Sequence, residues 1–125
     1  MSNPQSAILP EASPFAQYTL LKVTQNPQLV LEQLQALPAL VAELNSNQPG
    51  ANLAISIAFT KSFWQQLDVA MPEELIDFPV LGEGDIVAPS TEVDVLLHVH
   101  SNRHDLHFYL LRKFMSSVSD SVSIV

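Results

Sequence analysis

Four histidines are the residues of this chain whose type and spacing could support chemistry. His98 and His100 stand two apart in an alternating apolar stretch, so in a strand both would point to the same face. His104 and His107 stand three apart and would share one side of a helix. Together with Asp105, such histidines could bind zinc or iron. The two pairs need not converge, and we favour structural or interfacial histidines over metal ligands, with contact to a cofactor as a third reading.

The sequence Arg103-His104-Asp105 could support acid–base chemistry. In that reading Asp105 orients His104 as a base, but the only nearby nucleophile is Ser101. In the structural reading Asp105 complements the dipole at a helix start, while Arg103 pairs with it or with Asp94. We favour the structural reading.

Two other groups of residues receive non-catalytic interpretations. The segment Gly82-Glu-Gly-Asp85 lacks the lysine and hydroxyl residue of a phosphate-binding loop, and its carboxylates would repel an anion, so we predict a plain loop. The carboxylates between residues 73 and 94 are typical of a solvated acidic segment. The aromatic pairs Phe63-Trp64 and Phe108-Tyr109 are expected in the core rather than as surface electron-transfer groups.

The composition indicates one globular domain and excludes several function classes. The chain has 125 residues, 47% of them hydrophobic and 14% charged, with a formal net charge of −8. The hydrophobic composition argues against a disordered chain. The negative net charge argues against nucleic acid and anionic membranes as partners. The absence of cysteine excludes disulfides and thiolate chemistry. The first residues lack the pattern of a signal peptide, and no apolar run reaches the roughly 18 residues of a membrane span, so a cytoplasmic protein is expected.

Alternating and helical periodicities predict the elements that must position these residues. One helix is expected from Asn26-Pro27 to 48–50, with its N-cap at Asn26 and a kink or restart before Pro38. A second long helix is expected to follow an N-cap at Ser101 or Asn102. Short helical turns are expected at 61–67 and 72–76. Strands are predicted over 15–23, 53–60, 93–101 and 121–125. The order β-α-β-β-α-β is that of an α+β, ferredoxin-like fold, with a four-stranded antiparallel sheet and two long helices on one face.

One sheet face would then lack a cover. Alternation assigns Leu53, Ile55, Ile57, Phe59 and Val93, Val95, Leu97, Val99 to the helix side. The other side is too apolar for a comfortable solvent surface, and exposed apolar patches often mark interfaces. The candidate interface residues on it are Ala54, Ser56, Ala58, Leu96, His98 and His100.

Several motifs resemble one enzyme family along the whole chain. They are Gln5-Ser-Ala-Ile-Leu-Pro-Glu-Ala12, Leu37-Pro-Ala-Leu40, Phe78-Pro79, and 91–100 followed by Arg103-His104-Asp105. Together they resemble the N-terminal half of dye-decolourising (DyP-type) haem peroxidases. That resemblance implies an intact enzyme of two ferredoxin-like halves, which uses haem b and hydrogen peroxide to oxidise dyes and other electron donors. The family's Gly-x-x-Asp-Gly motif is not present at Gly82, because Ile86 replaces its second glycine.

The resemblance also implies that the catalytic and haem-binding residues come later in such enzymes. We therefore assign no catalytic, cofactor-binding or metal-binding residue here, and expect haem only in the intact enzyme. Residues 1–14 are expected to form an extended arm and 15–125 a single domain. Its partner would be the second half or another subunit across the uncovered face, in a homo-oligomer without nucleic acid or membrane. The alternatives are a stand-alone dimeric α+β module that binds a ligand or haem and, more distantly, a metal-dependent enzyme using His98, His100 and His104.

Overall fold

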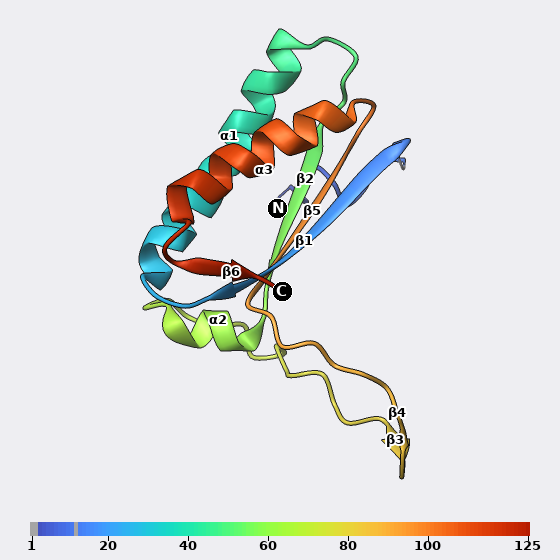
Figure 1. The fold of residues 1–125 in the computed structure, drawn as a ribbon, viewed down its shortest axis with the longest axis vertical. Coiled ribbons are helices and arrows are strands. Elements are labelled where there is room, and N and C mark those ends of the chain that lie inside the picture. Colours follow the sequence, from blue (N-terminus) through green and yellow to red (C-terminus); the bar gives the residue numbers. More distant parts are fainter. Residues whose placement is uncertain (1–2, 12) are drawn as a thin grey trace.

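The computed structural model describes residues 3–11 and 13–125 and contains the predicted four-stranded antiparallel sheet. Its strands lie in the order β2-β5-β1-β6, and helices α1 and α3 pack together on one face (Figure 1). The elements of this body are β1 (Phe15–Val23), α1 (Pro27–Asn47), β2 (Ala54–Phe59), β5 (Val95–Ser101), α3 (His104–Val118) and β6 (Val122–Ile124). The predicted β-α-β-β-α-β order and the ferredoxin-like architecture are confirmed.

The central strand β5 sets the register of the sheet. On one side it pairs with β1, from Phe15 opposite Ser101 to Leu21 opposite Val95. On its other side it pairs with β2, from Ala54 opposite His100 to Phe59 opposite Val95. Because side chains alternate along a strand, Val95, Leu97 and Val99 all point to the helices and are fully buried, as the sequence pattern predicts.

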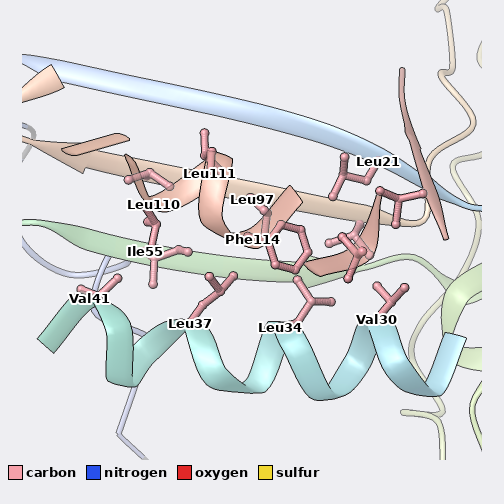
Figure 2. Packing of buried hydrophobic residues seen from close by; sticks show 14 of the residues in the cluster. Leu21, Val30, Leu34, Leu37, Val41, Ile55, Leu97, Leu110, Leu111 and Phe114 are labelled. Atoms are coloured by element: carbon pink, nitrogen blue, oxygen red, sulfur yellow. The ribbon is translucent and has the colours of Figure 1, made fainter. Parts of the chain in front are cut away.

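The core lies between the sheet and the two helices. Val30, Leu34, Leu37 and Val41 form the inner stripe of α1, and Figure 2 shows them facing the sheet. Helix α3 contributes Leu110, Leu111 and Phe114 to the same layer, next to Leu21, Ile55 and Leu97. Full burial of each large apolar side chain contributes about 1.5–3 kcal/mol to folding. This layer holds the two helices on one face.

Helix α1 begins as predicted, with Asn26 at the N-cap and Pro27 in the first turn, whereas the start of α3 differs from the sequence prediction. Asn26 stands at the N-cap of α1 with a φ of 49°, and its side chain makes no capping hydrogen bond. The N-cap of α3 is Arg103 rather than Ser101 or Asn102. Helix α1 also continues through Pro38 without a restart, because the buried stripe on both sides of that proline packs on one surface.

The connection between β2 and β5 contains three short elements. Helix α2 (Lys61–Gln66) is capped by the hydroxyl of Thr60, and Leu75 N–H donates to the Pro72 carbonyl in a turn where a helical turn was predicted. Residues 82–85, predicted as loop, lie instead in a hairpin of β3 (Gly82–Glu83) and β4 (Ile86–Val87). It projects away from the sheet and the helices (Figure 1).

The N-terminal arm is not extended throughout. Ile8 N–H donates to the Gln5 carbonyl at 3.0 Å, which closes a turn. Residues 1, 2 and 12 of the predicted arm lie outside the described residues. Within the part of the chain that is described, no helix combines the length and apolar character needed to cross a membrane.

Candidate functional site

The structure brings all six predicted interface residues together on the sheet face opposite the helices. They lie in three cross-strand rows, in which each β5 residue is flanked by one residue of β2 and one of β1. The rows are Ala54–His100–Ala16, Ser56–His98–Tyr18 and Ala58–Leu96–Leu20. Tyr18 and Leu20 extend the predicted set, because β1 alternates in register with β5. We call this surface the bare face.

His98 lies at the centre of the bare face and stacks on Tyr18. Their ring centroids are 4.4 Å apart with an interplanar angle of 9°, and the His100 ring lies 5.6 Å away. Burial, and then the neighbouring His100, lower the pKa of His98 below its usual value of 6.5. The lowered pKa favours the neutral ring of His98, which suits a contact surface better than a charged group.

The N-terminal arm covers one end of the bare face, which the sequence analysis treated as wholly uncovered. Ser13 Oγ lies 3.0 Å from His100 Nδ1, and the arm passes behind the sheet in Figure 1, opposite the helices. His100 and Ala54 are each only 6% exposed although no helix lies over them. Thus the row formed by Ala54 and His100 is closed by the chain itself.

The same arm pairs with the free edge of β2 through side chains. The Gln5 amide donates to the Ile57 carbonyl at 2.9 Å and accepts from Ile57 N–H at 2.7 Å. Ser6 Oγ bonds in the same two-way manner with Ile55, at 3.3 Å and 3.1 Å. These four bonds satisfy backbone groups that an edge strand otherwise presents to other chains.

The rest of the bare face remains accessible. Tyr18 is 64% exposed and Ala58 is exposed, while Leu20, Leu96 and His98 are half-buried. This mixture of apolar groups around one neutral stacked pair contains no carboxylate or cation. Such a surface can bury apolar area against a partner.

The helix-side histidines form a separate pair. His107 is fully buried, and its Nε2 lies 2.7 Å from Ser101 Oγ. The ring of the exposed His104 packs against the rings of His107 and Phe15, with centroids 5.5 Å and 5.8 Å away. The Ser101–His107 bond was not predicted from the sequence, because the end of a strand meets a helix face there and no local pattern marks the contact.

Asp105 does not orient His104, so the acid–base reading of this segment is wrong. The Arg103 guanidinium bonds to Asp105 at 2.6 Å and 3.1 Å, and this hydrogen bonding lowers the pKa of the carboxyl group. Arg103 also donates to the Gln48 side chain at the end of α1. Asp94, the other predicted partner of Arg103, instead accepts from Val23 N–H at 2.7 Å. The cluster therefore ties the start of α3 to α1.

The histidines of the described residues are not grouped as metal ligands. Within residues 3–11 and 13–125, no three histidine or acidic side chains are grouped to hold a metal ion. A haem iron needs an axial ligand beside an apolar slot. His100 and His107 are engaged by Ser13 and Ser101, and the apolar cavity of about 590 Å³ between α1, α2 and β2 has no histidine in its lining. The described residues do not fit the group.

Two aromatic predictions are resolved. Phe63 is buried in the core, as expected, while Trp64 is half-buried, and the Phe59 ring contacts both of them edge-on. Phe108 and Tyr109, predicted in the core, are exposed on the outer side of α3. They lie outside the stripe of α3 that meets α1 and the sheet.

Comparison with known families identifies what this fold and surface resemble. The family model described as Dyp-type peroxidase, N-terminal, matches residues 5–125. The dye-decolorizing peroxidase of Mycobacterium tuberculosis is 27% identical over 97 residues, which are 77% of this chain and 29% of that protein. Its counterpart in Mycolicibacterium paratuberculosis is 27% identical over 120 residues, covering 94% of this chain and 34% of that protein. The chain thus spans about a third of the length of these relatives.

Solved structures agree with the family match. The dye-decolorizing protein from V. cholerae is 61% identical with a TM-score of 0.91, over 98% of this chain and 41% of that one. The encapsulated DyP-type peroxidase from Mycobacterium smegmatis is 25% identical with a TM-score of 0.88, over 98% and 40%. A Rhodococcus jostii DypB variant in complex with heme is 22% identical with a TM-score of 0.77, over 96% and 40%, and shows the shared fold.

Proposed function

This chain belongs to the Dyp-type peroxidase family as its N-terminal domain, and we propose that it acts there as the scaffold that supports a haem-carrying second half. The intact enzyme would use hydrogen peroxide to oxidise dyes and other electron donors. In this proposal residues 15–125 form one domain, and the arm before them fastens the sheet. Peroxide cleavage would be carried out by groups outside residues 1–125.

The accessible part of the bare face is the observation that supports a scaffold role. Tyr18, Leu20, Ala58 and Leu96 expose apolar area beside the neutral His98 on the side without helices. A partner that covers them would gain about 25 cal/mol for each Å² of apolar surface removed from water. This chain corresponds to only 41% of the length of the solved V. cholerae protein, and the remainder of such a protein is the partner that we propose.

Haem binding is assigned to the intact enzyme rather than to this chain. When bound, haem supplies an iron centre that reacts with peroxide. The contribution proposed for this chain is to present an apolar wall that excludes water from the junction of the two halves. The heme complex of the R. jostii DypB variant, which shares the fold, supports haem as the cofactor of the whole enzyme.

A hemin titration of the 125-residue chain, followed by the Soret band, tests the assignment of haem. We expect no saturable red-shifted band, and no difference between the wild-type chain and the variants His98→Ala and His100→Ala. A stoichiometric band that either substitution removes would contradict the proposal. It would support the alternative of a stand-alone dimeric α+β module that binds haem or another ligand on this face.

A matched pair of substitutions tests the scaffold interface. Ala58 on the bare face and Ala36 on the side of α1 next to α3 are both exposed, and each would become glutamate. With the remaining half of the enzyme supplied separately, Ala58→Glu should weaken its binding to this chain at least tenfold, because a charge would be buried without a partner. Ala36→Glu should leave binding unchanged. Equal binding by both variants would place the interface elsewhere.

Homo-oligomerisation of the intact enzyme and a cytoplasmic location complete the proposal. Both were expected from the sequence and both stay predictions.

A further inference from the structure

The β3–β4 hairpin exposes apolar side chains on a projecting ribbon. Val80 is 86% exposed and Ile86 is 85% exposed, and Leu81 and Val87 are exposed as well. The ribbon points away from the body of its own chain in Figure 1. A two-stranded ribbon of this size is marginally stable alone, and exposed apolar area of this kind marks a contact surface.

The hairpin has a defined turn rather than an arbitrary loop. Glu83 pairs with Ile86, and Ala88 N–H donates to the Leu81 carbonyl at 2.8 Å. Gly82 has a φ of 131°, and a Cβ there would lie 2.1 Å from the Ile86 carbonyl oxygen. Only glycine permits this close approach of the two strands. The local sequence therefore builds a ribbon whose tip carries the carboxylates of Glu83 and Asp85.

The outer side of α3 has the complementary character. Arg112 lies over the Phe108 ring at 5.8 Å, and Lys113 over the Tyr109 ring at 6.0 Å. Phe108 is 64% exposed, and a shallow hollow of about 340 Å³ lies beside it, with Leu111 and Arg112 in its lining. Aromatic rings under cations offer apolar area and positive charge together.

Charge complementarity selects the occupant of this surface. Only five side chains are basic against 13 acidic ones. Lys22 pairs with Glu92 and Arg103 with Asp105, whereas within the described residues Arg112 and Lys113 form no ion pair. They are also the only adjacent basic pair in the sequence. An acidic, apolar ribbon that cannot reach its own α3 matches this aromatic and basic surface on another molecule.

We propose that the hairpin of one copy of this chain docks on the outer side of α3 of a second copy. Glu83 and Asp85 face Arg112 and Lys113, while the apolar side chains of the ribbon cover Phe108 and Tyr109. Two copies related by a twofold axis exchange both hairpins, which closes the assembly. This contact uses a surface separate from the bare face and goes beyond the scaffold role proposed above.

Charge exchange between the two surfaces tests the proposal. One variant carries Glu83→Lys and Asp85→Lys, and the other carries Arg112→Glu and Lys113→Glu, both on an Ala58→Glu background that disables the bare face. Sedimentation velocity should show self-association weakened at least tenfold in each variant. Mixing the two variants should restore a 1:1 complex. The lysine-bearing hairpin of the first variant then meets the glutamate-bearing α3 of the second, and the second variant's acidic hairpin meets the basic α3 of the first. A chain with all four substitutions should associate with itself again.

The control carries Glu32→Lys and Asp68→Lys, which change the net charge by as much as the hairpin variant does at exposed positions elsewhere. It should associate like the background chain. A monomeric background chain at all concentrations would overturn the proposal. Association that survives both single-surface variants would also overturn it. Hemin binding plays no part in these measurements, so failure here leaves the proposed function standing.

Discussion

Ser13 Oγ lies 3.0 Å from His100 Nδ1 and joins the N-terminal arm to the central strand of the sheet, 87 residues later in the sequence. The bond lies over the face that the helices leave without cover. Together with the Gln5 and Ser6 bonds to the edge of β2, it makes the arm part of the sheet. The arm thereby limits the surface available to a partner to the end that carries Tyr18 and Leu96.

Ser13→Ala should release this end of the arm. The loss of one partly buried hydrogen bond should lower the free energy of unfolding by about 1 kcal/mol. Hydrogen exchange of the His100 backbone amide and limited proteolysis after residue 11 should both become faster. Ser90→Ala, a change of the same type at an exposed position before β5, is the control. Unchanged protection in Ser13→Ala would show that the arm is held by other contacts.

Gln5→Ala should expose the edge of β2. Ile57 would lose two bonds to the Gln5 amide, and the edge would become available to other chains. Light scattering at rising protein concentration should show faster aggregation than in the wild type. Gln5→Glu keeps the acceptor and loses the donor, so its aggregation rate should lie between those of the wild type and Gln5→Ala. Aggregation no faster than wild type in Gln5→Ala would contradict a protective role.

Removing Ser101 should destabilise the fold more than removing its partner His107. Ser101→Ala leaves His107 Nε2 buried without a partner and removes the acceptor of Arg103 N–H, so it should cost about 1–3 kcal/mol. His107→Leu removes a ring whose Nδ1 already lacks a partner, while Ser101 keeps its bonds to Arg103. Urea unfolding should find His107→Leu less harmful than Ser101→Ala. The reverse order would mean that the imidazole contributes more than its neighbours indicate.

Stability should fall as the pH falls below neutral. Burial, then His100, lower the pKa of His98, and burial, then His104 and His100, lower that of His107 against an opposing effect of Asp105. Because both folded pKa values lie below the usual 6.5, the unfolded chain takes up protons first, and unfolding is favoured as pH drops through that value. Urea titrations between about pH 8 and pH 5 should show this slope, reduced in His98→Gln. A flat profile would contradict the lowered pKa values.

Two phenylalanines of α3 separate core from surface. Phe114 is buried between α1 and the sheet, so Phe114→Ala should cost about 3–5 kcal/mol by leaving a cavity. Phe108 is exposed, so Phe108→Ala should cost less than about 1 kcal/mol. Thermal unfolding of both variants compares them directly. Similar losses would mean that Phe108 is packed in solution.

Periodicity in the sequence predicted most of the fold. The alternation of β2 and β5 placed Ile55, Leu97 and Val99 on the helix side, because burial follows the local repeat of each element. The same alternation collected the six residues of the bare face, and the sequence motifs indicated the family. These properties depend on residues close together in the sequence and on the order of the elements.

The tertiary structure alone decided the partners of the polar groups. Ser13 meets His100, Ser101 meets His107, and Arg103, for which the sequence left Asp105 and Asp94 open, pairs with Asp105 and with the end of α1. A hydrogen bond requires two atoms to lie within about 3 Å, and elements distant in the sequence reach that separation only through packing of the whole chain. The hairpin at Gly82 and the exposure of Phe108 also depend on the packing of the whole chain, because a side chain is buried only where another element packs against it.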